Sequence, residues 1–258
     1  MGILNVTPDS FSDGGRYVDR DRALAHARQM RGDGADLIDI GGESSRPGAS
    51  PVAESEELDR VLPLVEALAA EDVALAVDTR KPAVMRAAVA AGAVMINDIG
   101  ALTAAGAIEA CAAGSVGVCL MHMQREPATM QAAPAYGDVV AEVRAFLVAR
   151  AEACMAAGIA RERIAIDPGF GFGKTLAHNL ALLRSIGTLA ATGFPVVAGL
   201  SRKASLGAIT GRSTGERMPA SLAAALAAVA RGAAIVRVHD VRETVDALRV
   251  WRAVESGI

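Results

Sequence analysis

Polar side chains capable of chemistry recur in this chain at one kind of position, the point where a short apolar run ends and a helical pattern begins. In chain order they are Asn5, Glu43 to Ser45, Asp78, Asn97, His122, Asp167, Ser201 to Lys203, and Arg237 with His239. A strand that is buried on both faces has no reason to end in such groups unless they act at its tip. In a barrel of parallel strands all strand ends open onto one face, so these residues would converge there. The pattern therefore indicates an enzyme.

The elements that must position these residues alternate between strand and helix along the whole chain. Strands are predicted at 1–6, 36–42, 74–79, 94–99, 117–122, 164–169, 196–202 and 234–239. Helices are predicted near 19–32, 54–70, 81–91, 104–113, 138–157, 175–191, 214–231 and 240–255. This alternation favours a parallel sheet, and no Gly-x-Gly-x-x-Gly follows the first strand. We therefore expect an α/β fold of the (β/α)8 (TIM) barrel type, forming a single domain over residues 1–258.

Local signals refine three of the predicted helices. Ser213 with Glu216, and Asp240 with Glu243, have the spacing of reciprocal capping pairs at helix starts. Pro63 lies inside the second predicted helix and is expected to bend it.

Composition limits the classes of protein that fit. The chain has 258 residues, a formal net charge of −3 and no run of Lys or Arg, which argues against a nucleic-acid surface. No apolar stretch approaches the ~18 residues of a membrane span. The cysteines Cys111, Cys119 and Cys154 lie in apolar segments without C-x-x-C spacing. They predict buried thiols in a reducing cytoplasm. The chain also starts inside its first predicted strand, which suggests that a lead-in has been trimmed.

Two motifs suggest other chemistry and can be set aside. Gly169 to Thr175 resembles a phosphate-binding P-loop, but the pattern needs Gly at position 168, where this chain has Pro168. A zinc hydrolase barrel would carry two His on its first strand, whereas the strand-end histidines here are His122 and His239. A tightly held zinc site is therefore not expected.

Two long polar loops follow the first two predicted strands. They read Asn-Val-Thr-Pro-Asp-Ser-Phe-Ser-Asp-Gly-Gly over 5–15 and Gly-Gly-Glu-Ser-Ser-Arg-Pro-Gly over 41–48. Each could be an ordinary solvated turn. Because they lie at neighbouring strand tips and contain glycine, we expect them to act as mobile active-site loops.

Together these segments resemble the dihydropteroate synthase family. The resemblance rests on the two loops and on Val-Asp-Thr (77–79), Ile-Asn-Asp (96–98), Leu-Met-His-Met-Gln (120–124), Asp-Pro-Gly-Phe-Gly-Phe-Gly-Lys (167–174), Ser-Arg-Lys (201–203) and Arg-Val-His (237–239). It covers every predicted strand end in the family's order. It implies condensation of 6-hydroxymethyl-7,8-dihydropterin diphosphate with 4-aminobenzoate, giving dihydropteroate and diphosphate for folate synthesis. It also implies Mg2+ as cofactor, inhibition by sulfonamides and a homodimer.

The resemblance assigns the pterin to four residues. Asp167 matches a carboxylate that accepts from the ring N–H and the exocyclic amine, and Asn97 and Asp78 match further contacts to the ring. Lys203 matches a lysine that meets the ring carbonyl and a ring nitrogen. For Asp78 and Asp167 the alternative is helix N-capping, since both precede predicted helices.

The diphosphate and metal are likewise assigned by resemblance. Arg237 and His239 lie two residues apart on one strand, so they point to the same side, and they match the family's anion pocket. For Arg237 a structural salt bridge is the alternative. Asn5 matches the residue that ligates Mg2+ and lies beside the diphosphate. A sparse protein site is expected, because Mg2+ takes few protein ligands when phosphates supply the others.

The remaining assignments concern the second substrate and the reaction. Ser45, Arg46, Pro47 and Phe172 resemble the 4-aminobenzoate pocket. The resemblance implies an SN1-like route, in which diphosphate leaves before the amine attacks. Phe11 and Asp13 match residues that cover the cationic pterin, and with Arg46 and Lys203 they complete the implied catalytic set.

The chain departs from the family pattern at three positions, and two rival functions remain. Ala204 replaces a Ser that helps hold the aminobenzoate carboxylate, a contact that would pass to backbone N–H groups or to Ser205. Ser45 stands where some members have Thr, and Arg125 replaces the usual Gly. A pterin-binding methyltransferase would share the Asp and Asn contacts, but it has no diphosphate to hold. A silent paralogue that only binds pterin is the other alternative.

Overall fold

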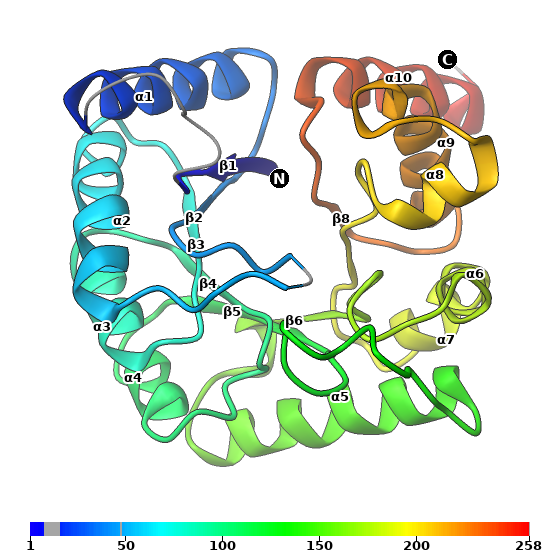
Figure 1. The fold of residues 1–258 in the computed structure, drawn as a ribbon, viewed down its shortest axis with the longest axis horizontal. Coiled ribbons are helices and arrows are strands. Elements are labelled where there is room, and N and C mark those ends of the chain that lie inside the picture. The colour runs from blue at the N-terminus through cyan, green and yellow to red at the C-terminus, as the bar shows by residue number, and fades with distance from the viewer. Residues whose placement is uncertain (8–15, 47, 258) are drawn as a thin grey trace.

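The computed structural model describes residues 1–7, 16–46 and 48–257, and gives side chains for these except 16–19. The strands are β1 (Gly2–Asn5), β2 (Ile38–Gly41), β3 (Leu75–Asp78), β4 (Met95–Asp98), β5 (Gly117–Met121), β6 (Ile164–Asp167), β7 (Val197–Ala198) and β8 (Ile235–Val236). The helices are α1 (Arg16–Gly32), α2 (Glu54–Ala69), α3 (Pro82–Ala90), α4 (Ala107–Ala112), α5 (Val139–Ala156), α6 (Leu176–Arg184), α7 (Ile186–Ala190), α8 (Ala204–Thr210), α9 (Met218–Val229) and α10 (Val241–Ser256). The helices surround the strands (Figure 1).

The strands form a closed ring. Strands β1 to β6 pair in parallel in chain order, and β7 pairs in parallel with β8. Parallel bridges join Ile166 to Val196 and Gly2 to Val238, so the two sheets meet on both sides. At the second seam the amide N of Ile3 donates to the carbonyl O of Val238 over 3.0 Å. The expected (β/α)8 barrel is therefore confirmed.

Alternation along each strand separates two apolar regions. Ile38 and Ile40 belong to the main core between strands and helices, as do Val61, Leu64, Val65 and Leu68 of α2. A second, smaller cluster fills the inside of the barrel with Met95, Cys119, Ala165, Val197 and Ile235. Successive strand residues point to opposite faces, so the last inward residue of each strand faces the open end.

The helical layer departs from the predicted one in two places. The predicted helix 175–191 is divided into α6 and α7 at Ser185, whereas α2 runs through Pro63 as predicted and its bend stays a prediction. Helix α8 was not predicted. It contains Gly207, which weakens a helical pattern, and a Cβ there would lie 2.3 Å from the Arg217 guanidinium, so that side chain would have to move.

Two caps had different outcomes. Ser213 and Glu216 form the predicted capping box, which opens a short 3-10 helix (Thr214–Glu216) ahead of α9. The prediction for Asp240 was wrong, because its side chain makes no capping bond at α10. Instead its carboxylate accepts from Arg202 Nε at 3.0 Å.

The three cysteines are buried and free, as predicted. Among the described residues, none of the helices has the length and apolar character that crossing a membrane requires.

Candidate active site

A cavity of about 920 Å³ opens at the carboxyl ends of the barrel strands. Every predicted site residue that the structure describes lines it: Asn5, Ser45, Arg46, Asp78, Asn97, Asp167, Phe172, Lys203, Arg237 and His239. Three further predicted residues, Phe11, Asp13 and Pro47, lie outside the described residues. The barrel thus gathers residues far apart in sequence around one space, although their individual roles stay predictions.

Asp167 ends β6 and is almost fully buried at the floor of the cavity. Its Oδ1 accepts from the amide N of Gly169 over 2.7 Å. Burial raises the pKa of its carboxyl, against the opposing effects of that hydrogen bond and of Lys203. Asp167 does not cap a helix, because Thr175 is the N-cap of α6. Its carboxylate is therefore available to a ligand.

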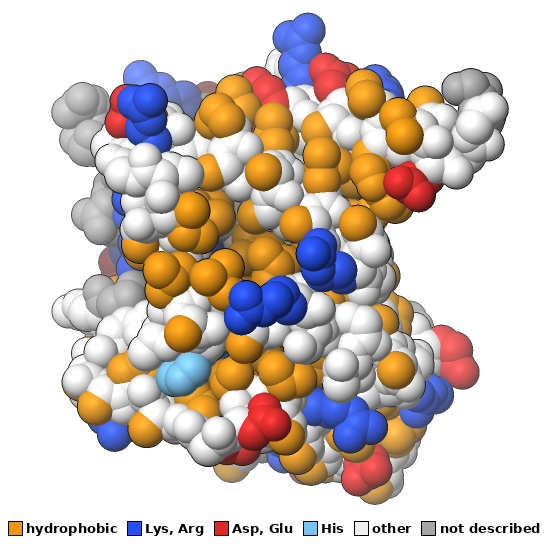
Figure 2. All heavy atoms as spheres, turned by 90° about the vertical axis from the view of Figure 1, so that its right-hand side faces the viewer, with side chains coloured by type: hydrophobic (Ala, Val, Ile, Leu, Met, Phe, Trp, Pro, Cys, Tyr) orange, Lys and Arg blue, Asp and Glu red, His pale blue; other side chains and the backbone are white. Residues whose placement is uncertain are grey.

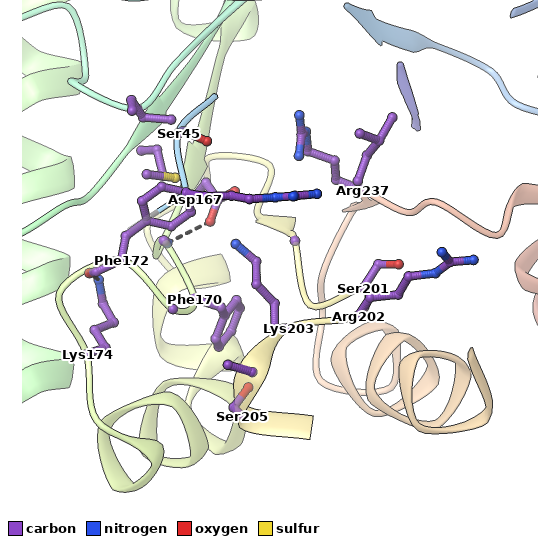
Figure 3. Close-up of a pocket in the computed structure, with 18 of the residues that line it drawn as sticks. Ser45, Asp167, Phe170, Phe172, Lys174, Ser201, Arg202, Lys203, Ser205 and Arg237 are labelled. Atoms are coloured by element: carbon purple, nitrogen blue, oxygen red, sulfur yellow. Dashed lines mark hydrogen bonds between the residues drawn. The ribbon is translucent and has the colours of Figure 1, made fainter. Parts of the chain in front are cut away.

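Lys203 reaches the cavity from the start of α8. Its Nζ lies 4.3 Å from the centroid of the Phe172 ring, and Figure 3 shows its amine pointing toward Asp167. Burial, followed by the charge of Arg237, lowers the pKa of Lys203 to about 8. The lysine is thus still mostly charged at neutral pH.

The P-loop-like segment builds a tight wall instead of a phosphate cradle. Gly169 and Gly173 have φ of 69° and 62°. A Cβ at Gly169 would lie 1.9 Å from the carbonyl O of His122. Lys174 is buried and donates to the carbonyl O of Phe172 at 2.9 Å, and its Nζ lies 3.0 Å from His122 Nδ1. Burial lowers the pKa of Lys174 to about 7. This lysine therefore ties Phe172 to the end of β5 and does not face a phosphate.

Arg237 makes two ion pairs and also lines the cavity. Its Nε donates to Asp39 Oδ2 at 2.5 Å and its Nη2 donates to Asp78 Oδ2 at 3.1 Å. Burial opposes its charge, but Asp39 and Asp78 outweigh burial and raise its pKa. The salt-bridge alternative is thus present, in a residue that also lines the cavity.

Asp78 is the partner of Arg237 at the end of β3. Burial raises the pKa of its carboxyl to about 7, with Arg237 acting in the opposite direction. Asp78 is not a helix cap, since the N-cap residue of α3 is Lys81.

His239 is held against Ser201 with 3.0 Å between Nδ1 and Oγ. Burial, then the charges of Arg237 and Arg202, lower its pKa to about 4. Without a ligand it is therefore neutral at physiological pH.

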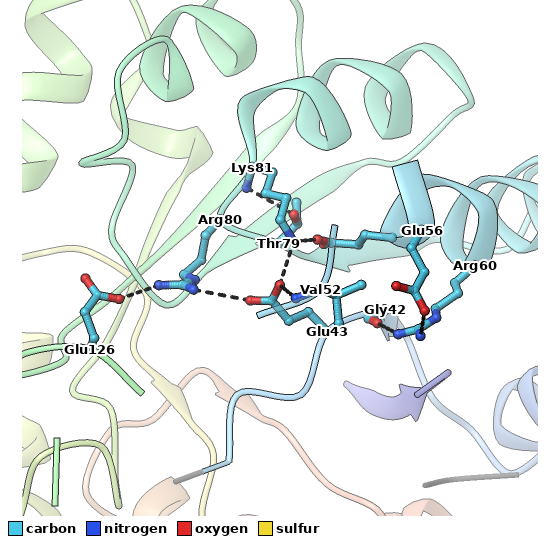
Figure 4. Close-up of polar contacts among 10 residues, drawn as sticks. Gly42, Glu43, Val52, Glu56, Arg60, Thr79, Arg80, Lys81 and Glu126 are labelled. Carbon is cyan, nitrogen blue, oxygen red and sulfur yellow. Dashed lines mark hydrogen bonds and ion pairs between the residues drawn. The ribbon is translucent and has the colours of Figure 1, made fainter. Parts of the chain in front are cut away.

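The loop that carries Ser45 and Arg46 is fixed at its base by Glu43. This carboxylate accepts from Lys81 Nζ at 2.6 Å, from Arg80 Nη2 at 3.2 Å and from the amide N of Val52 at 2.9 Å (Figure 4). Burial raises the pKa of Glu43, but these donors outweigh it and lower the pKa overall. Glu43 therefore anchors the base of the second loop, and the mobility expected of both loops stays a prediction.

The same network extends to two other elements. Lys81 also donates to Glu57 on α2, a carboxylate that is 1% exposed. Arg80 also donates to Glu126, beyond β5, at 2.6 Å. Glu43 thus connects the second loop to α2 and to the segments after β3 and β5.

Sequence reasoning missed Asp39 and Lys174. Asp39 lies inside a strand and not at its tip, although a carboxylate within Leu-Ile-Asp-Ile was a visible signal. Lys174 was noted as part of the P-loop-like segment and of the family motif 167–174, but no role was predicted for it.

The fold and the convergent polar cavity define a (β/α)8-barrel enzyme. A family model described as "Pterin binding enzyme" matches residues 1–239. The dihydropteroate synthase of Neisseria meningitidis serogroup B is 54% identical over 98% of this chain and 91% of its own length. That of Escherichia coli K12 is 50% identical over 100% of this chain and 92% of its own. The chain belongs to the pterin-binding enzyme family, with the dihydropteroate synthases as its relatives.

Solved structures agree. Dihydropteroate synthase of Yersinia pestis, in a sulfonamide drug complex, superposes with a TM-score of 0.94 at 51% identity, covering 99% of this chain and 94% of that one. The Burkholderia cenocepacia enzyme complexed with 7,8-dihydropteroate gives 0.91 at 56% identity, covering 100% and 91%.

Proposed function

We propose that this chain is a dihydropteroate synthase, a transferase of folate biosynthesis. It condenses 6-hydroxymethyl-7,8-dihydropterin diphosphate with 4-aminobenzoate to give 7,8-dihydropteroate and diphosphate. The observation that carries the proposal is the cavity itself, since it gathers every described residue that the family resemblance assigns to the substrates. Relatives at about half identity over nearly the whole chain support the same activity.

The pterin is proposed to bind at the floor. A buried carboxylate facing adjacent ring N–H and amine donors forms a strong, charge-assisted pair, which suits Asp167. Asn97 is 6% exposed and lines the same space, where its amide can both donate and accept. Lys203 supplies a positive donor for the ring carbonyl, and Asp78 completes the edge.

The diphosphate is proposed to bind beside Arg237. Arg237 contributes charge, and neutral His239 contributes an N–H donor. The residues present suit Mg2+, because the Asn5 side-chain oxygen is a hard ligand on the cavity wall. Asn5 would hold the ion, whose chemistry is to neutralise the charge of the departing diphosphate. No group of three His, Cys, Asp or Glu among the described residues could hold a metal ion, and phosphate oxygens and water would supply the other ligands.

The reaction is proposed to follow an SN1-like course. The bond between the pterin methylene carbon and the diphosphate oxygen breaks, and the electron pair leaves with diphosphate. The amine of 4-aminobenzoate then donates its lone pair to that carbon and loses one proton. The aniline nitrogen is already neutral at pH 7, so no strong base is required, and positioning dominates. Ser45, Arg46 and Phe172 would orient the amine. The roles of Phe11, Asp13 and Pro47 stay predictions.

Further properties are proposed from the family. Sulfonamides would compete with 4-aminobenzoate, the protein would act in the cytoplasm, and it would form a homodimer. Apolar side chains exposed on α8 and α10, Ile209, Val250 and Val254, support an interface. They belong to the helices on the side drawn in Figure 2, where hydrophobic and basic side chains are interspersed.

One assay tests the function. Diphosphate release is measured with the pterin substrate, with and without 4-aminobenzoate, and the products are separated by chromatography. We expect dihydropteroate to form in step with diphosphate. Pterin binding without any diphosphate release would favour the silent paralogue and contradict the proposal.

A further inference from the structure

Asp39 lies inside the barrel, just below the floor of the cavity. It occupies the middle of β2, opposite Ile3 of β1 and Ala76 of β3. Its neighbours Ile38 and Ile40 pack outward against the helices, so its side chain points inward. It is 0% exposed. A carboxylate this deeply buried is costly unless its contacts compensate.

Its contacts reach two parts of the site. Asp39 Oδ2 accepts from Asn97 Nδ2 at 3.0 Å and from Arg237 Nε at 2.5 Å. Its other oxygen, Oδ1, has no hydrogen-bond partner among the described residues. One buried oxygen therefore holds both the amide beside the proposed pterin edge and the cation beside the proposed diphosphate.

The contact to Asn97 decides which way that amide faces. The two ends of an Asn side chain have nearly the same shape, so only hydrogen bonding distinguishes them. An ionised carboxylate can only accept, so the NH2 group of Asn97 must face Asp39. Asn97 Oδ1 accepts no hydrogen bond from the described part of the chain. This oxygen and the second N–H of the Asn97 amide are therefore available to a ligand.

We infer that Asp39 is a positioning residue for pterin recognition, fixing the Asn97 amide in the orientation that presents its oxygen to the ring. The inference rests on the proposed function, because the pterin is the ligand proposed to hydrogen-bond to the Asn97 amide. Asp39 does not line the cavity, so it acts through Asn97. Without it, Asn97 could present either end, and a pterin donor would meet the wrong group in part of the population.

The test is a double-mutant cycle in which calorimetry measures the affinity for a pterin without diphosphate. Asp39→Asn should weaken binding by roughly two- to tenfold, the loss typical of one hydrogen bond between neutral groups. In an Asn97→Ala background the same change should have less than a roughly twofold effect, because the amide it orients is gone. The inference is overturned if Asp39→Asn weakens pterin binding by the same factor in both backgrounds. It is also overturned if folded Asp39→Asn binds pterin as tightly as the wild type.

A matched control separates orientation from general damage. Asp98 is the next residue on β4 and is 1% exposed, but it accepts from the amide N atoms of Gly100 and Leu102 on the other face of the strand. Asp98→Asn should lower the melting temperature as much as Asp39→Asn. If Asp98→Asn weakens pterin binding, it should do so by the same factor in the Asn97→Ala background.

A second variant covers the case in which Asp39→Asn does not fold. The exchange Asp39→Asn with Asn97→Asp keeps one carboxylate and one amide in the pair, so residue 39 can donate to the new carboxylate and the net charge near Arg237 is unchanged. It should fold, yet bind pterin at least roughly tenfold more weakly, because residue 97 can no longer donate. Wild-type affinity in the exchanged protein would show that the amide at position 97 is not what the ring reads.

Failure of the proposed function is distinguishable from failure of this inference. The wild-type protein is assayed first for pterin binding and diphosphate release. If it does neither, the function and the inference fall together. If the wild type binds pterin and releases diphosphate, but the effects of Asp39→Asn and Asn97→Ala on pterin affinity are independent, only the inference about Asp39 is wrong.

Discussion

The Nζ atom of Lys203 lies 4.3 Å from the centre of the Phe172 ring, so a cation from the start of α8 stacks on a ring from the loop after β6. Such contacts stabilise a cation by about 0.5–2 kcal/mol, depending on burial. Lys174 donates to the carbonyl O of Phe172 at 2.9 Å and so holds its backbone. The contact between Lys203 and Phe172 joins the proposed pterin edge to the proposed 4-aminobenzoate pocket.

Pterin affinity should therefore depend on pH through Lys203. Its pKa is lowered to about 8, first by burial and then by Arg237. A ligand carbonyl favours the ammonium and raises that pKa in the complex, so the contribution of Lys203 to affinity should be constant below pH 8 and fall above it. Since one proton is coupled, the fall is at most about tenfold per pH unit. Calorimetry across pH 6.5–10 measures it.

Lys203→Arg is the control for this pH dependence, because arginine keeps its charge throughout the range. The loss above pH 8 should disappear in this variant. A loss that remains belongs to the ligand or to Lys174, whose pKa is about 7, and would remove Lys203 from pterin recognition.

Asp167→Asn should weaken pterin binding by roughly 1.5–3 kcal/mol. The amide must turn one donor toward a donor edge, and it loses the charge that strengthens the pair. The amide N of Gly169 can still donate to the remaining oxygen, so the fold should persist. Unchanged affinity in a folded variant would show that the carboxylate does not face the ring.

Metal removal tests Asn5. Activity should vanish with EDTA and return with Mg2+, and Asn5→Ala should raise the Mg2+ concentration needed for half-maximal rate. Asn5→Asp is the matched comparison, since it keeps an oxygen ligand. Activity that is indifferent to EDTA would contradict the proposed cofactor.

Substitution of Arg237 should affect stability and anion binding separately. Arg237→Ala leaves Asp39 and Asp78 without their cation, which should cost about 3–5 kcal/mol of unfolding free energy. Arg237→Lys keeps the charge and should recover part of this. Both should weaken diphosphate binding more than the binding of a pterin without diphosphate. Equal losses for the two ligands would place Arg237 in the scaffold alone.

Glu43→Gln should affect the second substrate selectively. It weakens the contacts to Lys81 and Arg80 that fix the base of the loop bearing Ser45. We expect a raised KM for 4-aminobenzoate and weaker sulfonamide binding, with pterin affinity unchanged. The unfolding free energy should fall by about 1–3 kcal/mol. If all ligands weaken equally, Glu43 supports the barrel and not that loop.

The strand-tip residues could be predicted because a barrel converts chain order into spatial convergence. Once eight strand ends were recognised, Asn5 and Arg237 had to meet. What the sequence could not supply were contacts decided by distant partners. Asp240 has the spacing of a helix cap, yet its carboxylate accepts a hydrogen bond from Arg202 instead of from the start of α10. Helix α8 contains Gly207, a weak helix former, and Arg217, ten residues further on, packs against it. Asp39 escaped notice because its partners are Asn97 and Arg237, far away in sequence.

The seam between Gly2 and Val238 joins residues near opposite ends of the chain. On the ribosome, β1 to β6 can pair in the order in which they emerge, since each strand bonds its predecessor. The ring cannot close until the last strand has left the exit tunnel. Until then the free edge of β1 offers unpaired N–H and C=O groups to other chains. A nascent chain that stalls before β8 would therefore expose an unpaired sheet edge, at which pairing with another chain can start.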